Sequence, residues 1–74
     1  MKLKYDHVKF TLVNQNDDVY VCTDRIADSM IGYVMLNKKV NRIVYTHAGN
    51  SLHTKEILQE IIQFIDQLER KHDV

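Results

Sequence analysis

Four histidines and one cysteine are the side chains of this 74-residue chain that raise the possibility of a zinc site. The histidines are His7, His47, His53 and His72, and the thiol is Cys22. Zinc takes imidazole and thiolate ligands tetrahedrally, and its known signatures place these ligands in pairs about two to five residues apart. His47 and His53 are separated by a loop, and no Cys-x-x-Cys pair occurs. The spacing therefore predicts no metal site.

Cys22 could act as a nucleophile only beside a histidine base, an orienting third group and a pocket that holds the substrate. His47 and His53 are the candidate bases, but nothing in their spacing orders the three side chains. A domain of this size rarely encloses a pocket of about 300 Å³, and no recognised catalytic motif occurs. Gly32 and Gly49 are isolated, so they cannot form a glycine-rich phosphate loop. We therefore expect a protein that is not an enzyme and that carries no cofactor.

Three cations, Lys38, Lys39 and Arg42, cluster between Tyr33 and Tyr45. Basic residues interleaved with aromatic rings can bind phosphates and stack on bases. The chain has no net positive charge that would attract nucleic acid, because ten Lys and Arg balance ten Asp and Glu. Nucleic-acid binding through Lys38, Lys39 and Arg42 is therefore an alternative interpretation. The plainer one is that lysines at the edge of a sheet prevent aggregation.

The hydrophobic pattern predicts the elements that position these side chains. Apolar residues alternate over about residues 8–13 and 19–23, which predicts two strands joined by a polar turn. Residues 30–36 and 40–46 are predicted to form a second hairpin. From about residue 54 to 71 the apolar residues recur at helical spacing, with Ser51 or Thr54 as the N-cap. The stripe predicted to pack on the sheet is Ile57, Ile61, Phe64, Ile65 and Leu68, whereas Glu60 is among the polar residues predicted on the other side of the helix. We therefore expect one α+β domain spanning residues 1–74, a small antiparallel sheet of three to four strands packed on one C-terminal helix.

The predicted strand over residues 30–36 is apolar on both faces. Regular alternation would place Met30, Val34 and Leu36 on one face, and Ile31, Tyr33 and Met35 on the other. A single helix about 10–12 Å wide covers only part of one face of a sheet whose strands are about 4.8 Å apart. We expect the helix to cover the first set, unless a bulge at Gly32 reverses the parity.

The uncovered apolar face is expected to be an interface, because exposed apolar patches usually mark interaction sites. Its predicted residues are Ile31, Tyr33, Met35 and Tyr45. A symmetric dimer through this face would bury the same strand of both subunits.

The single cysteine excludes an internal disulfide framework, and a reducing cytoplasm is the simpler interpretation. The first residues lack the apolar stretch of a signal peptide, and nowhere do about 18 apolar residues run together. We therefore expect a cytoplasmic protein that does not span a membrane.

Residues 30–68 resemble a loose class of small uncharacterised phage and prophage proteins. The resemblance rests on Ile31-Gly32-Tyr33-Val34, a hairpin with Arg42 and Tyr45, Ser51, and the helical run from Ile61 to Leu68. That class carries a Leu-Gly-Tyr-Val-type strand, a Trp-Arg pair, an aromatic strand and a helix ending in Phe-Ile-x-x-Leu. Here Asn41 stands in place of the tryptophan, and no proline follows the aromatic strand. The resemblance implies an accessory protein of a mobile element and carries over no activity.

Together these features predict a small protein-binding module, expected to be a homodimer, that acts by occupying the surface of a protein partner. The alternative is a nucleic-acid-binding accessory protein.

Overall fold

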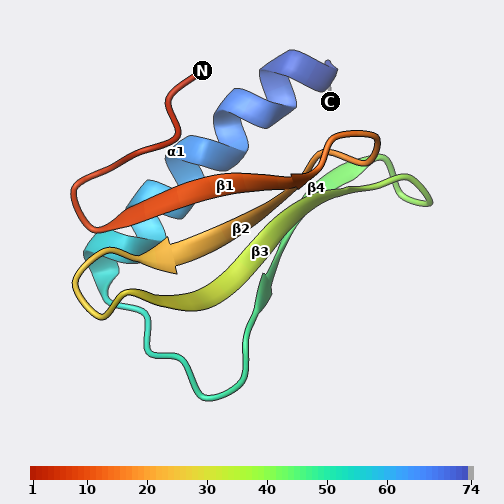
Figure 1. The fold of residues 1–74 in the computed structure, drawn as a ribbon. Coiled ribbons are helices and arrows are strands. Elements are labelled where there is room, and N and C mark those ends of the chain that lie inside the picture. The colour runs from red at the N-terminus through yellow and green to blue at the C-terminus, as the bar shows by residue number, and fades with distance from the viewer. Residues whose placement is uncertain (74) are drawn as a thin grey trace.

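The chain folds into four strands followed by one helix, and the computed structural model describes residues 1–73. The elements are β1 (Val8–Asn14), β2 (Val19–Asp24), β3 (Ser29–Asn37), β4 (Arg42–His47) and α1 (Lys55–His72). The strands form one antiparallel sheet in the order β1-β2-β3-β4 (Figure 1). The α+β fold expected from the sequence is confirmed. The last strand begins at Arg42, two positions later than expected, because the preceding turn extends to Asn41.

The three hairpin turns share one local design, which explains how they form without proline and without glycine. The residue that opens each turn accepts a backbone N–H with its side-chain oxygen: Asn14, Asp24 and Asn37. The residue that closes each turn has a positive φ: Asp18 (49°), Asp28 (54°) and Asn41 (52°). Asn and Asp suit both roles, because their short side chains bond nearby backbone and tolerate the left-handed region.

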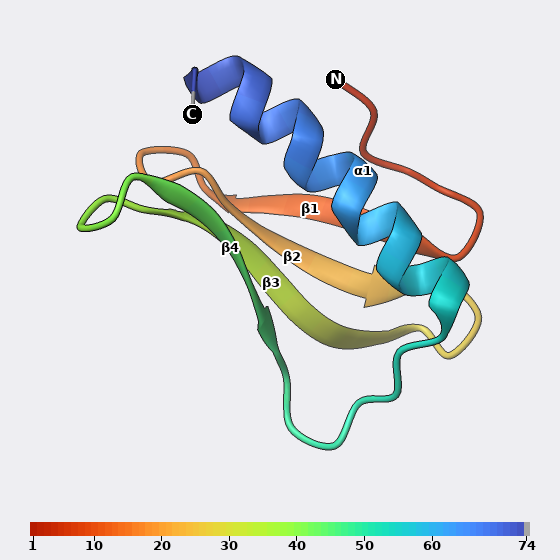
Figure 2. The same cartoon turned by 180° about the vertical axis from the view of Figure 1, so that it is seen from behind.

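Helix α1 lies across one face of the sheet and leaves the other face open (Figure 2). Its N-cap is Thr54, whose hydroxyl accepts from the Ile57 N–H at 3.2 Å, whereas the Ser51 hydroxyl donates to the Ala48 carbonyl. The helix buries four apolar side chains: Ile57, Ile61, Phe64 and Leu68. The predicted apolar stripe is thus confirmed at these positions, while Ile65 is half-buried at the margin.

Phe64 is the centre of the core between α1 and the sheet. Its ring stacks on Phe10 with 3.8 Å between the centroids and meets Tyr20 edge-on at 5.1 Å. The full buried apolar set is Tyr5, Val8, Phe10, Tyr20, Cys22, Ile31, Val34, Ile43, Ile57, Ile61, Phe64 and Leu68. All four strands therefore contribute to one core on the helix side.

A bulge in β3 changes the facing of its first residues. Cys22 pairs with Gly32 while Thr23 pairs with Met30, so Ile31 is an extra residue in β3. Ile31 consequently turns toward α1 and is 4 % exposed, whereas Met30 turns away and is 52 % exposed. The expected facing was wrong for these two residues and right for the rest of the strand, because an inserted residue shifts the alternation by one.

Candidate functional site

The open face of the sheet carries an apolar set from three neighbouring strands, here called the outer patch: Val21, Tyr33, Met35 and Val44. Val21 pairs with Tyr33, and Met35 pairs with Val44, so the four side chains form two adjoining cross-strand pairs. Each is partly exposed. Cross-strand neighbours on one face lie within contact distance of each other, so these residues form a continuous surface.

Two of the four predicted interface residues lie elsewhere. Ile31 is in the core because of the β3 bulge. Tyr45 pairs with the buried Val34 and therefore faces the helix side. The expectation that Ile31 and Tyr45 share the open face with Tyr33 and Met35 is wrong. The alternation in the sequence predicted Tyr33 and Met35, two of the four residues of the outer patch. It missed Val21 and Val44, because their cross-strand neighbours depend on the strand register.

The rim of the open face is polar and basic. Lys9 and Arg42 point to this side, as do three threonines: Thr11, Thr23 and Thr46. Among the strand residues that the structure describes, none of those on the open face is acidic. The charged strand residues around the outer patch are thus positive, while one carboxylate, Asp17 of the β1–β2 turn, lines a depression with Met35.

The three cations of the predicted nucleic-acid site do not form one free positive surface. Lys38 Nζ lies 3.4 Å from Asp17 Oδ1 of the neighbouring β1–β2 turn. Arg42 shares a surface depression with Glu69 of the helix. An exposed ion pair of this kind adds about 0–1 kcal/mol of stability, but it lowers the local positive potential that a phosphate would meet.

Tyr45, His53 and His47 form a cluster at the end of β4. The Tyr45 hydroxyl donates to the Ile31 carbonyl at 3.0 Å, so its oxygen can accept from His53 Nε2 at 2.5 Å. The His47 and His53 rings are 4.7 Å apart. Burial raises the pKa of Tyr45, and burial together with neighbouring His47 lowers the pKa of His53. Both groups are therefore neutral near pH 7, and the cluster ties the loop after β4 to the sheet.

The Tyr45 ring also explains why position 32 is glycine. A Cβ on Gly32 would overlap the Tyr45 hydroxyl and ring. Movement of the Tyr45 side chain alone would not make room for a Cβ, because the backbone carbonyl of Thr46 occupies the same place.

Cys22 lies in the core beneath this cluster and is fully buried. Burial raises its pKa to about 12. The nucleophilic form of cysteine is the thiolate, so Cys22 is unreactive near neutral pH. Within residues 1–73, no group of three or more His, Cys, Asp or Glu side chains is placed to hold a metal ion.

Glu60 is a buried carboxylate that the helical pattern assigned to the solvent side. It is 8 % exposed. Oε1 accepts from the backbone N–H groups of His7 at 2.9 Å and Val8 at 3.1 Å, and Oε2 contacts His7 Nδ1 at 2.5 Å. These bonds join the helix to the start of β1. No sequence spacing could have signalled them, because the partners are 53 residues apart.

The opposite end of the helix is held in the same way by Asp18. Its carboxylate contacts His72 Nε2 at 2.5 Å and Lys71 Nζ at 3.2 Å. Burial acts to raise the pKa of Asp18, but the bonds from His72 and Lys71 outweigh it and lower that pKa. Both ends of α1 are therefore fixed to the sheet by charged bonds.

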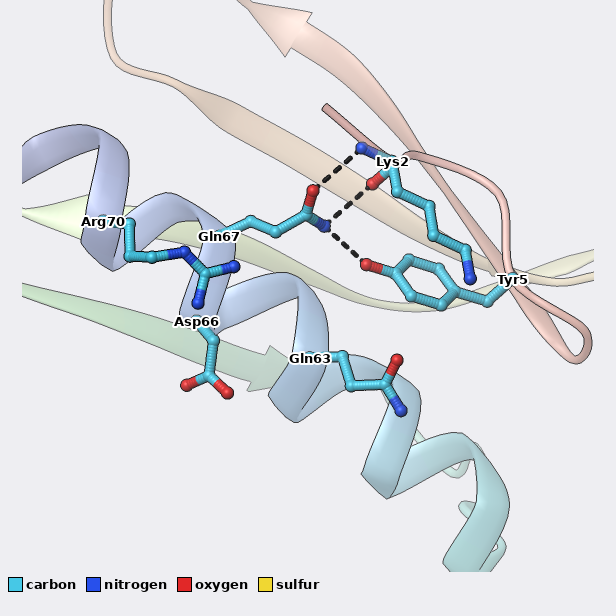
Figure 3. A pocket seen from close by; sticks show the side chains of 6 residues that line it. All are labelled: Lys2, Tyr5, Gln63, Asp66, Gln67 and Arg70. Carbon is cyan, nitrogen blue, oxygen red and sulfur yellow. Dashed lines mark hydrogen bonds between the residues drawn. The ribbon is translucent and has the colours of Figure 1, made fainter.

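The N-terminal arm, residues 1–6, borders a shallow depression of about 290 Å³ beside α1 (Figure 3). Gln67 holds the arm: its Oε1 accepts from the Lys2 N–H at 2.8 Å, and its Nε2 donates to the Lys2 carbonyl at 3.0 Å. The same Nε2 contacts the Tyr5 hydroxyl at 2.5 Å. The Lys2 ammonium lies 4.5 Å from the centre of the Tyr5 ring. These polar groups bond to one another, so the residues that line the depression hold the N-terminal arm against α1.

No helix within residues 1–73 has the length and apolar character needed to cross a bilayer.

Comparison with known proteins gives no relative: no family model matches the chain, and no curated protein and no solved structure is significantly similar to it.

Proposed function

We propose that this chain is a small protein-binding module without enzymatic activity, and that it acts by occupying a partner's surface with the outer patch. The observation that carries this proposal is the open apolar face. Helix α1 covers one side of the sheet (Figure 2), no other element of residues 1–73 lies over the other side (Figure 1), and the outer-patch residues there are partly exposed. Tyr and Met are enriched in the cores of protein interfaces, and Tyr33 and Met35 are central to the patch.

The charge of the rim defines the chemistry of the partner. Lys9 and Arg42 are the charged residues on the open face, and both are positive. A complementary partner therefore presents an apolar contact surface flanked by carboxylates, since matched potentials increase the association rate and reject wrong partners. An accessory protein of a mobile element is the setting that the resemblance of residues 30–68 suggests, and the single cysteine favours the cytoplasm.

The reactive groups of the chain support a binding role over catalysis. Burial keeps the Cys22 thiol and the Tyr45 hydroxyl protonated near neutral pH. The buried Glu60 carboxylate is occupied by His7 and Val8. None of these groups is free to act on a substrate.

Binding of single-stranded nucleic acid is the second candidate. The observation that favours it is Tyr33, an aromatic ring on the face where the described strand residues include no carboxylate, near Arg42 and the basic turn with Lys38 and Lys39. Asp17 and Glu69 beside these cations weaken it, because they reduce the attraction for phosphate.

A charge placed in the outer patch should abolish partner capture. We expect Met35→Glu to lose the partner that the tagged wild type captures from a lysate of the source organism, because a carboxylate would be buried against an apolar surface. Ile26→Glu, at a site that is 84 % exposed in the β2–β3 turn, should still capture it. Quantitative mass spectrometry after nuclease treatment measures both. Equal capture by Met35→Glu contradicts the proposal, and loss of capture on nuclease treatment favours the second candidate.

Nucleic-acid binding, if it occurs, should depend on Lys38, Lys39 and Arg42. Replacing all three with alanine should abolish binding of a fluorescent single-stranded oligonucleotide and remove its steep salt dependence. Binding that persists with an unchanged salt slope would place the contact elsewhere on the molecule.

A further inference from the structure

The two edges of the sheet differ. The edge of β1 is closed by the N-terminal arm, where the Leu3 carbonyl accepts from the Phe10 N–H at 2.7 Å and the Tyr5 N–H donates to the Val8 carbonyl at 2.8 Å. Strand β4 forms the other edge, and no further strand of residues 1–73 pairs beyond it (Figure 2). Within residues 1–73, no backbone bond reaches the free side of β4.

The direction of each backbone group in β4 follows from one bond. The Ala48 N–H donates to the Ile31 carbonyl at 3.0 Å. In an antiparallel ladder, hydrogen-bonded and non-bonded pairs alternate along the strand. The β3–β4 register is continuous, so Val44 and Thr46 bond to β3. The N–H and C=O groups of Ile43, Tyr45 and His47 therefore point to the free edge.

The middle of β4 lacks several devices by which edge strands prevent pairing, although Arg42 places one charge at the start of the strand. The missing devices are proline, a bulge and a charge that points inward. The chain has no proline, and the pairing of β4 with β3 is regular from Arg42 to His47. Its middle residues, Ile43, Val44 and Tyr45, carry no charge.

We propose that a second copy of this chain pairs with the free edge of β4, antiparallel, about a two-fold axis through Tyr45. Tyr45 then lies opposite Tyr45 of the partner subunit, and Ile43 lies opposite His47 of the partner subunit. In this register every edge-facing N–H meets an edge-facing C=O, because antiparallel pairs of such residues exchange both bonds. The two sheets join into one continuous sheet with both helices on the same side.

Charge favours antiparallel over parallel pairing of the two copies. The basic residues Lys38, Lys39 and Arg42 all lie at the start of β4. Antiparallel pairing places these groups of the two subunits at opposite ends of the joint, whereas parallel pairing would put like charges side by side, which is destabilising. The joint itself then contains no charge repulsion.

The side of the helix above β4 adds apolar surface to this joint. Leu58, Ile62 and Ile65 recur at helical spacing on one flank of α1, and Leu58 is 47 % and Ile62 57 % exposed. The flank faces β4, because Glu69 lies on it and shares a depression with Ile43. A strand joint alone buries too little for a stable dimer, and these side chains supply the additional area.

In this register Val44 of the outer patch lies opposite Thr46 of the partner subunit, whereas Val21, Tyr33 and Met35 lie on β2 and β3, away from the joint. The pairing therefore leaves most of the outer patch free for the proposed partner. It would place two outer patches on one continuous sheet face.

Amide hydrogen exchange tests the pairing without any mutation. In the wild type at about 100 μM, above a micromolar dissociation constant, the amides of Ile43, Tyr45 and His47 should exchange slowly, and at about 1 μM they should exchange fast. The amides of Val44 and Thr46 should be protected at both concentrations, because they bond to β3 within one subunit. A dimer through the outer patch would leave the first three amides fast at both concentrations, which overturns the proposal.

Sedimentation of matched variants tests the same joint. Ile62→Glu should raise the dissociation constant at least about tenfold, because it places a carboxylate in an apolar contact. Val13→Glu on β1 is the matched control, since Val13 and Ile62 are both 57 % exposed, and it should leave the dimer intact. A wild type that is monomeric at about 100 μM overturns the proposal. So does a Tyr33→Glu variant that becomes monomeric while Ile62→Glu stays dimeric.

Discussion

Phe64→Ala should lower the free energy of unfolding by about 3–5 kcal/mol, the range for truncating a fully buried aromatic side chain. Phe64 has no exposed surface, and its ring contacts Phe10 and Tyr20 at the centre of the core. The substitution removes the stacking partner of Phe10 and leaves a cavity that two rigid rings cannot fill by small movements. Chemical denaturation followed by circular dichroism measures the change.

Ile62→Ala is the matched control for this experiment. Ile62 lies on the same helix and is also apolar, but it is 57 % exposed. Its truncation should cost less than about 1 kcal/mol at a concentration where the chain is monomeric, because little surface is transferred from water. A loss below about 1 kcal/mol for Phe64→Ala would mean that the ring does not fill the core as the structure places it.

The helix could be predicted from the sequence because its pattern is long and periodic. Apolar spacing correctly assigned Ile57, Ile61, Phe64 and Leu68 to the sheet side. The same periodicity cannot separate a buried position from the margin of the apolar arc. Leu58 and Ile62 lie at that margin and stay exposed, because a single helix contacts the sheet only through the central part of its apolar arc.

The open face was predicted only in part, because β3 contains a residue that alternation cannot reveal. The bulge at Ile31 depends on the pairing with β2, which is a contact between distant segments. Tyr45 was misplaced because its facing depends on the register of β4 with β3, in which it pairs with the buried Val34. Glycine at position 32 was the available signal, since isolated glycine in a strand often marks a bulge or a close approach.

Glu60→Ala should lower the free energy of unfolding by about 2–4 kcal/mol, the second large effect that we expect. The substitution removes the acceptor of the His7 and Val8 N–H groups, and Val8 is fully buried. A buried N–H without an acceptor retains its full desolvation cost. Glu56→Ala, at an exposed position one turn earlier in the helix, should change stability by less than about 0.5 kcal/mol.

The same carboxylate should make stability depend on pH in a defined window. Burial acts to raise the pKa of Glu60, but the bonds from the His7 side chain and from the His7 and Val8 N–H groups outweigh burial and lower that pKa. The stabilisation that Glu60 contributes is therefore present above its ordinary pKa of about 4.5 and is lost as the pH falls through the lowered pKa.

His7 has the opposite dependence on pH. The bond to Glu60 raises the pKa of His7, although burial opposes it. The contribution of His7 is full below its ordinary pKa of 6.5 and is lost as the pH rises through the raised value.

The Glu60–His7 pair should therefore stabilise the fold most between the ordinary pKa values of its members, 4.5 and 6.5. Glu60→Gln keeps the shape and one acceptor but removes the charge, so it should remove this maximum. Denaturation of the wild type and of Glu60→Gln across about pH 3 to pH 8 measures the difference between them, which cancels the effect of Asp18. A difference that is constant over this range would show that the charge on Glu60 adds nothing to the bonds that join α1 to β1.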